Sequence, residues 1–246
     1  MIEKLTLISV ISKYYLNGMV EAVRWDIKDK NLNIKFTAPS KEMIGNITYK
    51  NIPLEDSIIG ISNTTQLNKL LHITSGYLDL KYTKQNKLFT KLIISDKQFT
   101  VNYALADLMI IPKSGDLNGD ILFNIEAKLD NESISAIVKA QTALSESETV
   151  LIKPTLNDDG DYQIEMEFGG NIEYANKVSF FIPNIMTNNV PDNFKVYYNS
   201  NMIKEIMYCN RDMVLGNISI NLDGLMKLEF ESKDLKSTYY LVAKEI

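Results

Sequence analysis

The chain has 246 residues, 45% of them hydrophobic, which is enough to bury one large core or two ordinary ones. Its 26 basic and 31 acidic side chains give a formal net charge of -5 at pH 7, and this balance argues against a protein that coats nucleic acid through a broad basic face. One cysteine and one histidine provide neither a disulfide framework nor a cluster of soft metal ligands, so we expect a cytoplasmic protein that needs no metal or other cofactor.

The first half of the chain predicts two helices among many strands. Residues 5–16 have apolar side chains at helical spacing and stop before Asn17-Gly18, which predicts an amphipathic helix too short to span a membrane. A second short helix is expected from Thr64 to about Gly76, because Leu67 and Leu71 lie on one face. Period-two patterns predict strands at residues 20–27, 32–37, 43–49, 57–61, 77–82, 88–94 and 99–105.

The second half repeats this order of elements. One helix is expected to follow Asp130 or Asn131, and another to follow Asn199 or Ser200, since these side chains cap helix N-termini. Strands are predicted at residues 121–125, 150–156, 162–168, 177–182, 194–198, 214–222, 225–230 and 238–243. The four helices are centred near residues 10, 69, 138 and 205, at intervals of about 60 to 70 residues, which indicates one folding unit used repeatedly.

A connector is expected between the halves. Residues 106–120 begin with an apolar run, meet Pro112 and continue into a segment rich in Ser, Gly and Asn. We therefore predict an N-terminal domain at residues 1–108, a connector at 109–117 and a C-terminal domain at 118–246. The connector either exposes apolar surface to a partner or is an ordinary strand end followed by a loop.

No familiar catalytic motif occurs in the sequence. It contains no Gly-rich phosphate loop and no HExxH, GxSxG or paired CxxC spacing. We expect His72 to face solvent, Cys209 to pack in the last turn of the fourth helix, and residues 157–161 to form a hairpin turn and not a calcium loop. The chain is therefore predicted not to be an enzyme, although a pair of carboxylates brought together by folding stays an open alternative.

The C-terminal quarter resembles a known family. Its strand, helix and three further strands, with LMKLEFES at residues 225–232 and YYLVAKEI at 239–246, resemble the C-terminal domain of the sliding DNA clamps. In the proliferating cell nuclear antigen branch the ending reads Tyr, Tyr, Leu, Ala, Pro, Lys. This chain keeps Tyr239, Tyr240, Leu241 and Lys244 around a different central pair. Its length and short loops look most like the trimeric clamps of tailed phages.

The resemblance implies both a fold and a function. The fold would be α+β, with two similar clamp-type domains whose helices lie on one face of antiparallel sheets and which assemble into a homotrimeric ring. The function would be that of a processivity factor in DNA replication, which slides on double-stranded DNA without sequence preference, is loaded by a clamp loader ATPase complex and tethers a DNA polymerase. In a phage the protein would work in the host cytoplasm. The alternatives are a non-catalytic β-rich phage structural or adaptor protein, and a hydrolase with an unrecognised acidic site.

Three sets of site residues follow from the resemblance. One lysine on each helix, opposite its apolar face, would face the DNA, although lysines on exposed helix faces are also ordinary: Lys13, Lys69, Lys139 and Lys204. A shallow pocket for partner peptides would combine the connector with C-terminal strands: Leu108, Met109, Ile110, Ile111, Leu225, Tyr240, Val242 and Ala243. For Leu225 and Tyr240, packing in the second domain's core is the alternative. Two edge strands would join the subunits: Phe99, Val101 and Tyr103 against Val178, Phe180 and Ile182.

Overall fold

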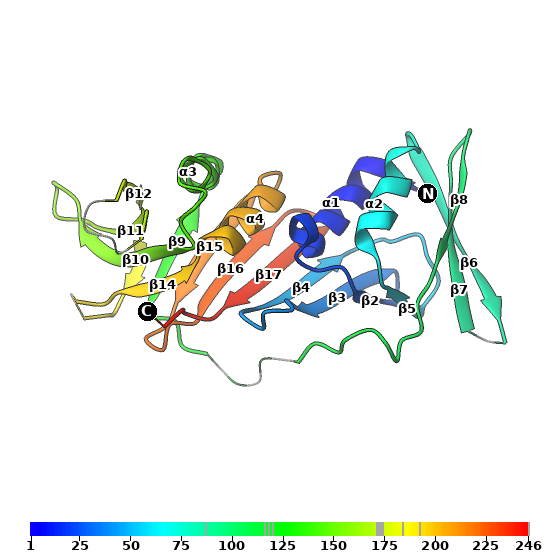
Figure 1. The fold of residues 1–246 in the computed structure, drawn as a ribbon, viewed down its shortest axis with the longest axis horizontal. Coiled ribbons are helices and arrows are strands. Elements are labelled where there is room, and N and C mark those ends of the chain that lie inside the picture. Colours follow the sequence, from blue (N-terminus) through cyan, green and yellow to red (C-terminus); the bar gives the residue numbers. More distant parts are fainter. Residues whose placement is uncertain are drawn as a thin grey trace. The chain divides into compact units, whose positions relative to one another are not determined.

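The computed structural model describes residues 1–86, 88–115, 117, 119, 121–170, 175–183, 185–191 and 193–245. The chain divides into two compact units, each built from helices and antiparallel sheets (Figure 1). Unit 1 consists of Met1–Asp116 with Lys233–Ser237, and unit 2 consists of Leu117–Ser232 with Thr238–Ile246.

Unit 1 contains most of its elements in one continuous run. In chain order these are β1 (Ile2–Glu3), α1 (Lys4–Tyr15), the short 3-10 helix η1 (Leu16–Gly18), β2 (Val23–Lys28), β3 (Asn31–Thr37), β4 (Met43–Tyr49), β5 (Ser57–Ile61), α2 (Thr64–His72), β6 (Tyr77–Gln85), β7 (Leu88–Ser95) and β8 (Thr100–Ala104). One sheet has the order β1-β6-β7-β8, and β5-β2-β3-β4 are neighbours in a second. The helices α1 and α2 pack together, and α1 also contacts β4 (Figure 1).

The core of unit 1 lies between its helices and the strands they cover. Trp25 of β2 and Tyr14 of α1 are fully buried, together with apolar residues of both helices. The strands alternate buried and exposed side chains, as in β2 and β3, because successive residues of a strand point to opposite faces of the sheet. Register places Phe36 opposite Gly45, where a Cβ would lie 2.0 Å from the Phe36 ring, so this pair depends on the missing side chain.

Unit 2 repeats the order with one additional strand. Its elements are β9 (Ile125–Leu129), α3 (Asn131–Ala143), β10 (Thr149–Leu156), β11 (Tyr162–Phe168), β12 (Val178–Ile182), β13 (Ile185–Asn188), β14 (Val196–Asn199), α4 (Ser200–Asn210), β15 (Leu215–Ile220), β16 (Met226–Glu231) and β17 (Leu235–Leu241), of which the first three residues are assigned to unit 1. One sheet has the order β12-β11-β10-β14, and β13-β9-β15-β16-β17 are neighbours in a second.

The two units share one topology. The neighbours β14-β10-β11-β12 correspond to β5-β2-β3-β4, and β9-β15-β16-β17 correspond to β1-β6-β7-β8. In each unit the first helix follows the first strand and packs against the second helix, as α1 does with α2 and α3 with α4. The prediction of an α+β fold with two similar halves is therefore confirmed.

Local capping explains where three helices begin. Asp130 Oδ1 accepts the Ser133 backbone N–H at 2.7 Å at the start of α3, and this bond holds the pKa of Asp130 below its usual value. Asn63 and Asn199 accept equivalent bonds at 2.8 and 3.1 Å from the amides three residues further on, at the starts of α2 and α4. None of the described helices has the length and apolar character needed to cross a membrane.

Some predicted strands differ from the structure. The strand expected at residues 121–125 lies further along, because β9 pairs with β15 from Ile125 to Leu129 and residues 121–123 have no strand structure. The short strands β1 and β13 were missed. Each of the two is defined by pairing with a distant strand, β6 and β9 respectively, and both are too short to show a period-two pattern.

Candidate functional site

The connector begins as an ordered turn that exposes two large apolar side chains. Asp107 Oδ1 accepts the Met109 N–H at 2.8 Å, and the Asp107 carbonyl accepts the Ile110 N–H at 3.2 Å. Met109 is 90% exposed and Ile110 is 70% exposed, whereas the next side chain, Ile111, is 3% exposed. The expected exposure of apolar surface is confirmed for Met109 and Ile110 but is wrong for Ile111, which anchors the turn in unit 1.

Arg24 of β2 holds this turn from a distant part of the sequence. Its Nη2 donates to the Leu108 carbonyl and, at 2.9 Å, to the Ile111 carbonyl. Its Nε is buried and has no hydrogen-bond partner among the residues that the structure describes. Sequence reasoning missed Arg24, since partners 84 and 87 residues away leave no local signal.

Gly60 of β5 fixes the start of the connector. The Ala106 N–H donates to the Gly60 carbonyl at 2.9 Å and forms an isolated antiparallel bridge. A Cβ at position 60 would lie 2.6 Å from the Ala106 carbonyl oxygen and 3.0 Å from Ile111 Cγ1. The connector can therefore approach β5 this closely only because residue 60 has no side chain.

The C-terminal members of the predicted peptide pocket lie on unit 2. Leu225, Tyr240 and Ala243 are half-buried, and Val242 is 48% exposed. A Cβ at Gly224 would lie 2.8 Å from the Ala243 Cβ, so the end of the chain packs beside the turn that precedes Leu225. The structure thus gathers Leu225 and Ala243 at one place on unit 2, and the four connector residues at one place on unit 1. The joining of these two sets into one pocket stays a prediction.

The four predicted lysines have different environments. Lys69 on α2 and Lys139 on α3 are exposed. The Lys204 side chain on α4 is 27% exposed, and its Nζ lies 3.3 Å from the Glu205 carboxylate. Lys13 is fully buried, which contradicts the expectation that it faces outward. The buried face of α1 includes Val10 and Lys13 follows it by three residues, so the apolar side of this helix is wider than the pattern indicated.

Another exposed cation lies at the end of α4. Arg211 is its C-cap residue, and the guanidinium lies 4.3 Å from the centroid of the Tyr208 ring, whose residue is 45% exposed. Sequence reasoning considered the helix faces opposite the apolar stripes. It did not include Arg211, because this residue follows the last residue of the helix.

The two strands predicted to join subunits are sheet edges. β8 ends the sheet β1-β6-β7-β8, and β12 ends the sheet β12-β11-β10-β14. Of the predicted interface side chains, Phe99 is 43% exposed and Val178 and Phe180 are half-buried. Val101, Tyr103 and Ile182 are buried in their own units.

Tyr103 has a structural role within unit 1. Its hydroxyl accepts the Asn63 N–H and donates to the Asn63 carbonyl, both at 3.1 Å, and burial raises its pKa. The side chain therefore ties β8 to the start of α2. What β8 and β12 offer to another chain is their free backbone edges and their outward-facing side chains.

His72 and residues 157–161, which were considered for catalysis and calcium binding, have local structural roles. His72 is exposed, and its Nδ1 lies 2.7 Å from the Asn68 carbonyl of the preceding helical turn. Asn157 Oδ1 accepts the N–H groups of Asp159 and Asp161 at 3.0 and 2.8 Å, which confirms a hairpin turn between β10 and β11. No group of three or more His, Cys, Asp or Glu side chains that could hold a metal ion occurs within the described part of the chain.

Comparison by sequence finds no relative: no family model matches the chain, and no curated protein does. Comparison by structure finds many similar folds. The complex titled as the C-terminal region of FEN-1 bound to PCNA of A. fulgidus matches with a TM-score of 0.75 and 15% identity, covering 100% of this chain and 97% of that one. PCNA denotes proliferating cell nuclear antigen.

Two further structures match over nearly their whole length. PCNA from Entamoeba histolytica has a TM-score of 0.76 and 15% identity, covering 99% of this chain and 96% of that one. The PCNA2-PCNA3 complex from Sulfolobus tokodaii has a TM-score of 0.73 and 10% identity, covering 99% and 98%. Identities this low show the fold alone. The chain has the fold of the PCNA-type clamps, and the fold predicted from the C-terminal resemblance is confirmed.

Proposed function

We propose that this chain is one subunit of a sliding clamp that encircles duplex DNA and tethers DNA-processing enzymes, among them a replicative DNA polymerase. The observation that carries the proposal is the likeness to PCNA structures over 99% or more of this chain, one of them bound to the C-terminal region of FEN-1. The mechanism would be topological and not catalytic, because a closed ring holds its partner on DNA without tight phosphate contacts. The chain's length and short loops favour the trimeric type of the tailed phages, acting in the host cytoplasm.

Ring closure would use the free edges of β8 and β12. Pairing β8 of one subunit with β12 of the next satisfies the open backbone groups of both edges, and three such contacts close a threefold ring. Phe99 and Phe181, each 43% exposed, lie beside β8 and within β12 and would be covered by the contact.

The decisive experiment measures assembly and topology together. Native mass spectrometry should show a species of three 28.0 kDa subunits. With its clamp loader and ATP, the protein should stay on a nicked circular plasmid during gel filtration and dissociate when the plasmid is cut to a linear form. A protein that is monomeric at every concentration tested, or that leaves circular and linear DNA at equal rates, would contradict the proposal and favour a structural or adaptor protein.

The DNA contacts would come from the lysines that remain at the helix surfaces, Lys69, Lys139 and Lys204, and not from Lys13. Each Lys→Glu replacement changes the charge by -2, so the triple variant changes it by -6, from -5 to -11 per chain. We expect this variant to stay trimeric while loading and processive synthesis by the cognate polymerase decrease, and the decrease should be larger at low salt.

A matched control separates local contact from net charge. Lys28, Lys41 and Lys97 are exposed and lie outside the helices, and their replacement by Glu gives the same total charge. If both triple variants lose synthesis equally, the helix lysines have no special position toward DNA.

Partner binding would use the connector together with the C-terminal end. Replacing Ile110 and Val242 by Ser removes one exposed apolar side chain from each set, and truncation of such an anchor typically costs about 2 kcal/mol, roughly thirtyfold in affinity. The measurement is titration of the C-terminal peptide of the cognate polymerase into the double variant. The control is Leu215→Ser, since Leu215 is 62% exposed on β15. Unchanged affinity in an intact trimer would place the partner site elsewhere.

A further inference from the structure

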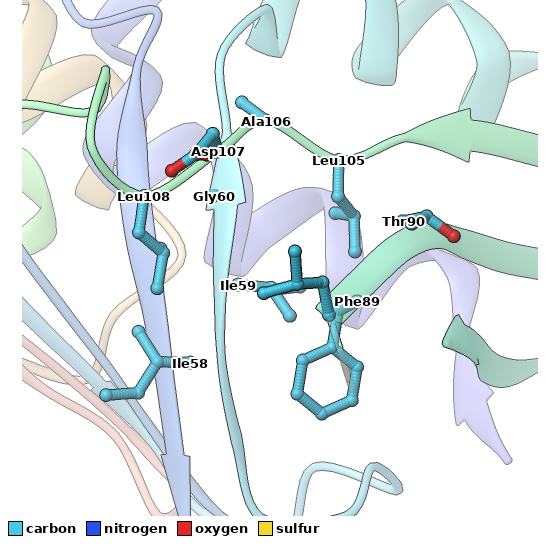
Figure 2. A pocket seen from close by; sticks show the side chains of 10 residues that line it. Ile58, Ile59, Gly60, Phe89, Thr90, Leu105, Ala106, Asp107 and Leu108 are labelled. Atoms are coloured by element: carbon cyan, nitrogen blue, oxygen red, sulfur yellow. The ribbon is translucent and has the colours of Figure 1, made fainter. Parts of the chain in front are cut away.

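An apolar cavity of about 460 Å³ opens beside β5 in unit 1 (Figure 2). Its walls come from β5, from the start of β7 and from the segment where β8 leads into the connector. In the view of Figure 2, Leu108 and Ile58 lie to one side of β5, and Leu105 and Phe89 lie to the other. Leu88 also lines it and is 67% exposed, and Ile58 is 47% exposed. The volume is within the range of ligand-binding clefts, which is roughly 300 to 1,000 Å³.

The same cavity lies along a free strand edge. β5 pairs with β2 on one side, and on its other side Gly60 accepts a hydrogen bond from Ala106. In a strand, residues two apart direct their backbone N–H and C=O groups to the same side, so those of Ile58 point the same way as the Gly60 carbonyl. No described residue pairs with them. The connector thus covers one end of this edge and leaves the part beside the cavity open.

We propose that this groove, the edge of β5 with the adjoining cavity, binds an extended peptide segment of a partner protein by strand addition. The peptide backbone pairs with Ile58, and an aliphatic or aromatic side chain of the peptide enters the cavity. The free N–H and C=O of Ile58 lie in strand geometry and favour an extended backbone as the occupant, and the apolar walls favour an apolar side chain.

The charges around the cavity indicate which residues of the peptide should lie next to its anchor, the apolar side chain that enters the cavity. Asp107 is the charged residue among the lining side chains and is exposed. At the β7 side, Lys84 Nζ lies 2.7 Å from the Glu55 carboxylate and 4.7 Å from the centroid of the Phe89 ring, so its charge is already partnered. A basic residue next to the anchor, on the side of Asp107, is therefore favoured in the peptide.

This site goes beyond the proposed clamp function. Except for Leu108, it uses none of the residues expected in the partner pocket, and all of its walls belong to unit 1, so it would be present in a monomer as well as in a ring. Its test therefore does not depend on assembly or DNA.

The experiment uses a displayed library of random peptides of about twelve residues, long enough for a strand of the usual length with flanks. The library is selected on the immobilised full chain and counter-selected on the double variant Ile58→Lys, Leu88→Lys. Enriched peptides are labelled with fluorescein and their affinities measured by fluorescence anisotropy. We expect a shared apolar anchor with a basic neighbour, and at least about tenfold weaker binding to the double variant.

Two controls make the result specific. Ile73→Lys adds one lysine, the same charge as Leu88→Lys alone, at an apolar residue of unit 1 that is 51% exposed and lies outside the groove, and it should bind as the parent does. N-methylation of the peptide, one amide at a time, should abolish binding at the amide that pairs with the Ile58 carbonyl and spare the amides next to it, because neighbouring amides of an added strand point to opposite sides. If the double variant fails to fold, Leu88→Lys alone provides the comparison.

The inference is overturned if no peptide is enriched over the double variant or if enriched peptides bind it within about twofold of the parent. It is also overturned if methylation of adjacent amides weakens binding equally. The oligomeric state of the same samples is measured separately. If the protein binds the peptide but is monomeric at every concentration tested, the monomeric state contradicts the clamp proposal and the peptide binding supports this inference.

Discussion

Replacing Arg24 by Met should loosen the connector turn without unfolding unit 1. Methionine matches the arginine side chain as far as Nε and has no donors, so it removes both hydrogen bonds to the carbonyls of Leu108 and Ile111. A hydrogen bond from a charged donor contributes roughly 1.5 to 3 kcal/mol. Arg24 is only half-buried, and its Nε has no partner among the described residues. We therefore expect the two bonds together to stabilise the closed turn by about 2 kcal/mol, which is roughly thirtyfold in its opening equilibrium.

Hydrogen exchange measures this opening directly. The Met109 and Ile110 amides are both bonded to Asp107 and exchange when the turn opens. In Arg24→Met they should exchange about thirtyfold faster, whereas amides in the centre of β3 keep their rates. Arg24→Lys is the matched variant. It keeps the charge but cannot reproduce the planar fork that reaches two carbonyls, so its effect should lie between those of the parent and the Met variant.

An increase of less than about threefold in Arg24→Met would refute the reasoning, because it would mean that Asp107 and the burial of Ile111 hold the turn without help from Arg24. Faster exchange throughout unit 1 would also count against it, since the loss would then be one of global stability.

Three further predictions concern stability and use urea denaturation. Gly60→Ala should destabilise unit 1 by about 1 to 3 kcal/mol and speed exchange of the Ala106 amide, because the new Cβ falls 2.6 Å from the Ala106 carbonyl oxygen. An unchanged denaturation midpoint would contradict this. Asp130→Ala should cost about 1 kcal/mol through the lost cap. Since the folded pKa of Asp130 is lowered, the contribution of its carboxylate to the free energy of unfolding is complete above the unfolded pKa of about 4 and is lost as pH falls through the folded pKa. Asp130→Asn should therefore lose less stability on acidification than the parent. Lys13→Glu should unfold unit 1 or lower its free energy of unfolding by more than about 3 kcal/mol, because Lys13 is buried. Lys139→Glu, at an exposed position, should stay within about 0.5 kcal/mol of the parent. Similar midpoints for the two variants would show that Lys13 is not buried in solution.

The sequence by itself determined the parts of the fold that depend on neighbours a few residues apart. The cap positions were narrowed to Asp130 or Asn131 and to Asn199 or Ser200, because a side chain that accepts an amide three residues on acts locally, and the structure assigns the role to Asp130 and Asn199. The strands β4, β5 and β11 have the predicted bounds, and in β4 and β11 the alternation over seven residues is itself the signal. The repeated order of elements was visible for the same reason, and the acidic-aromatic strand and C-terminal ending resembled the right fold.

The position of β9 shows where local pattern stops being sufficient. Residues 121–125 are as apolar as a strand, but the strand runs from Ile125 to Leu129 because those residues find partners on β15. Pairing between segments about 90 residues apart contributes nothing to a period counted along the chain.

Only the tertiary structure decided how the candidate sites are built. Lys13 lies in a helix whose pattern predicts that it faces solvent, and packing of the wider face of α1 buries it. Arg24 holds the connector, and Gly60 admits it to the edge of β5, across 84 and 46 residues of sequence. The physical reason is the same in each case: a burial or a hydrogen bond between distant segments exists only after the chain has folded, so the residues that make it carry no mark in the sequence around them.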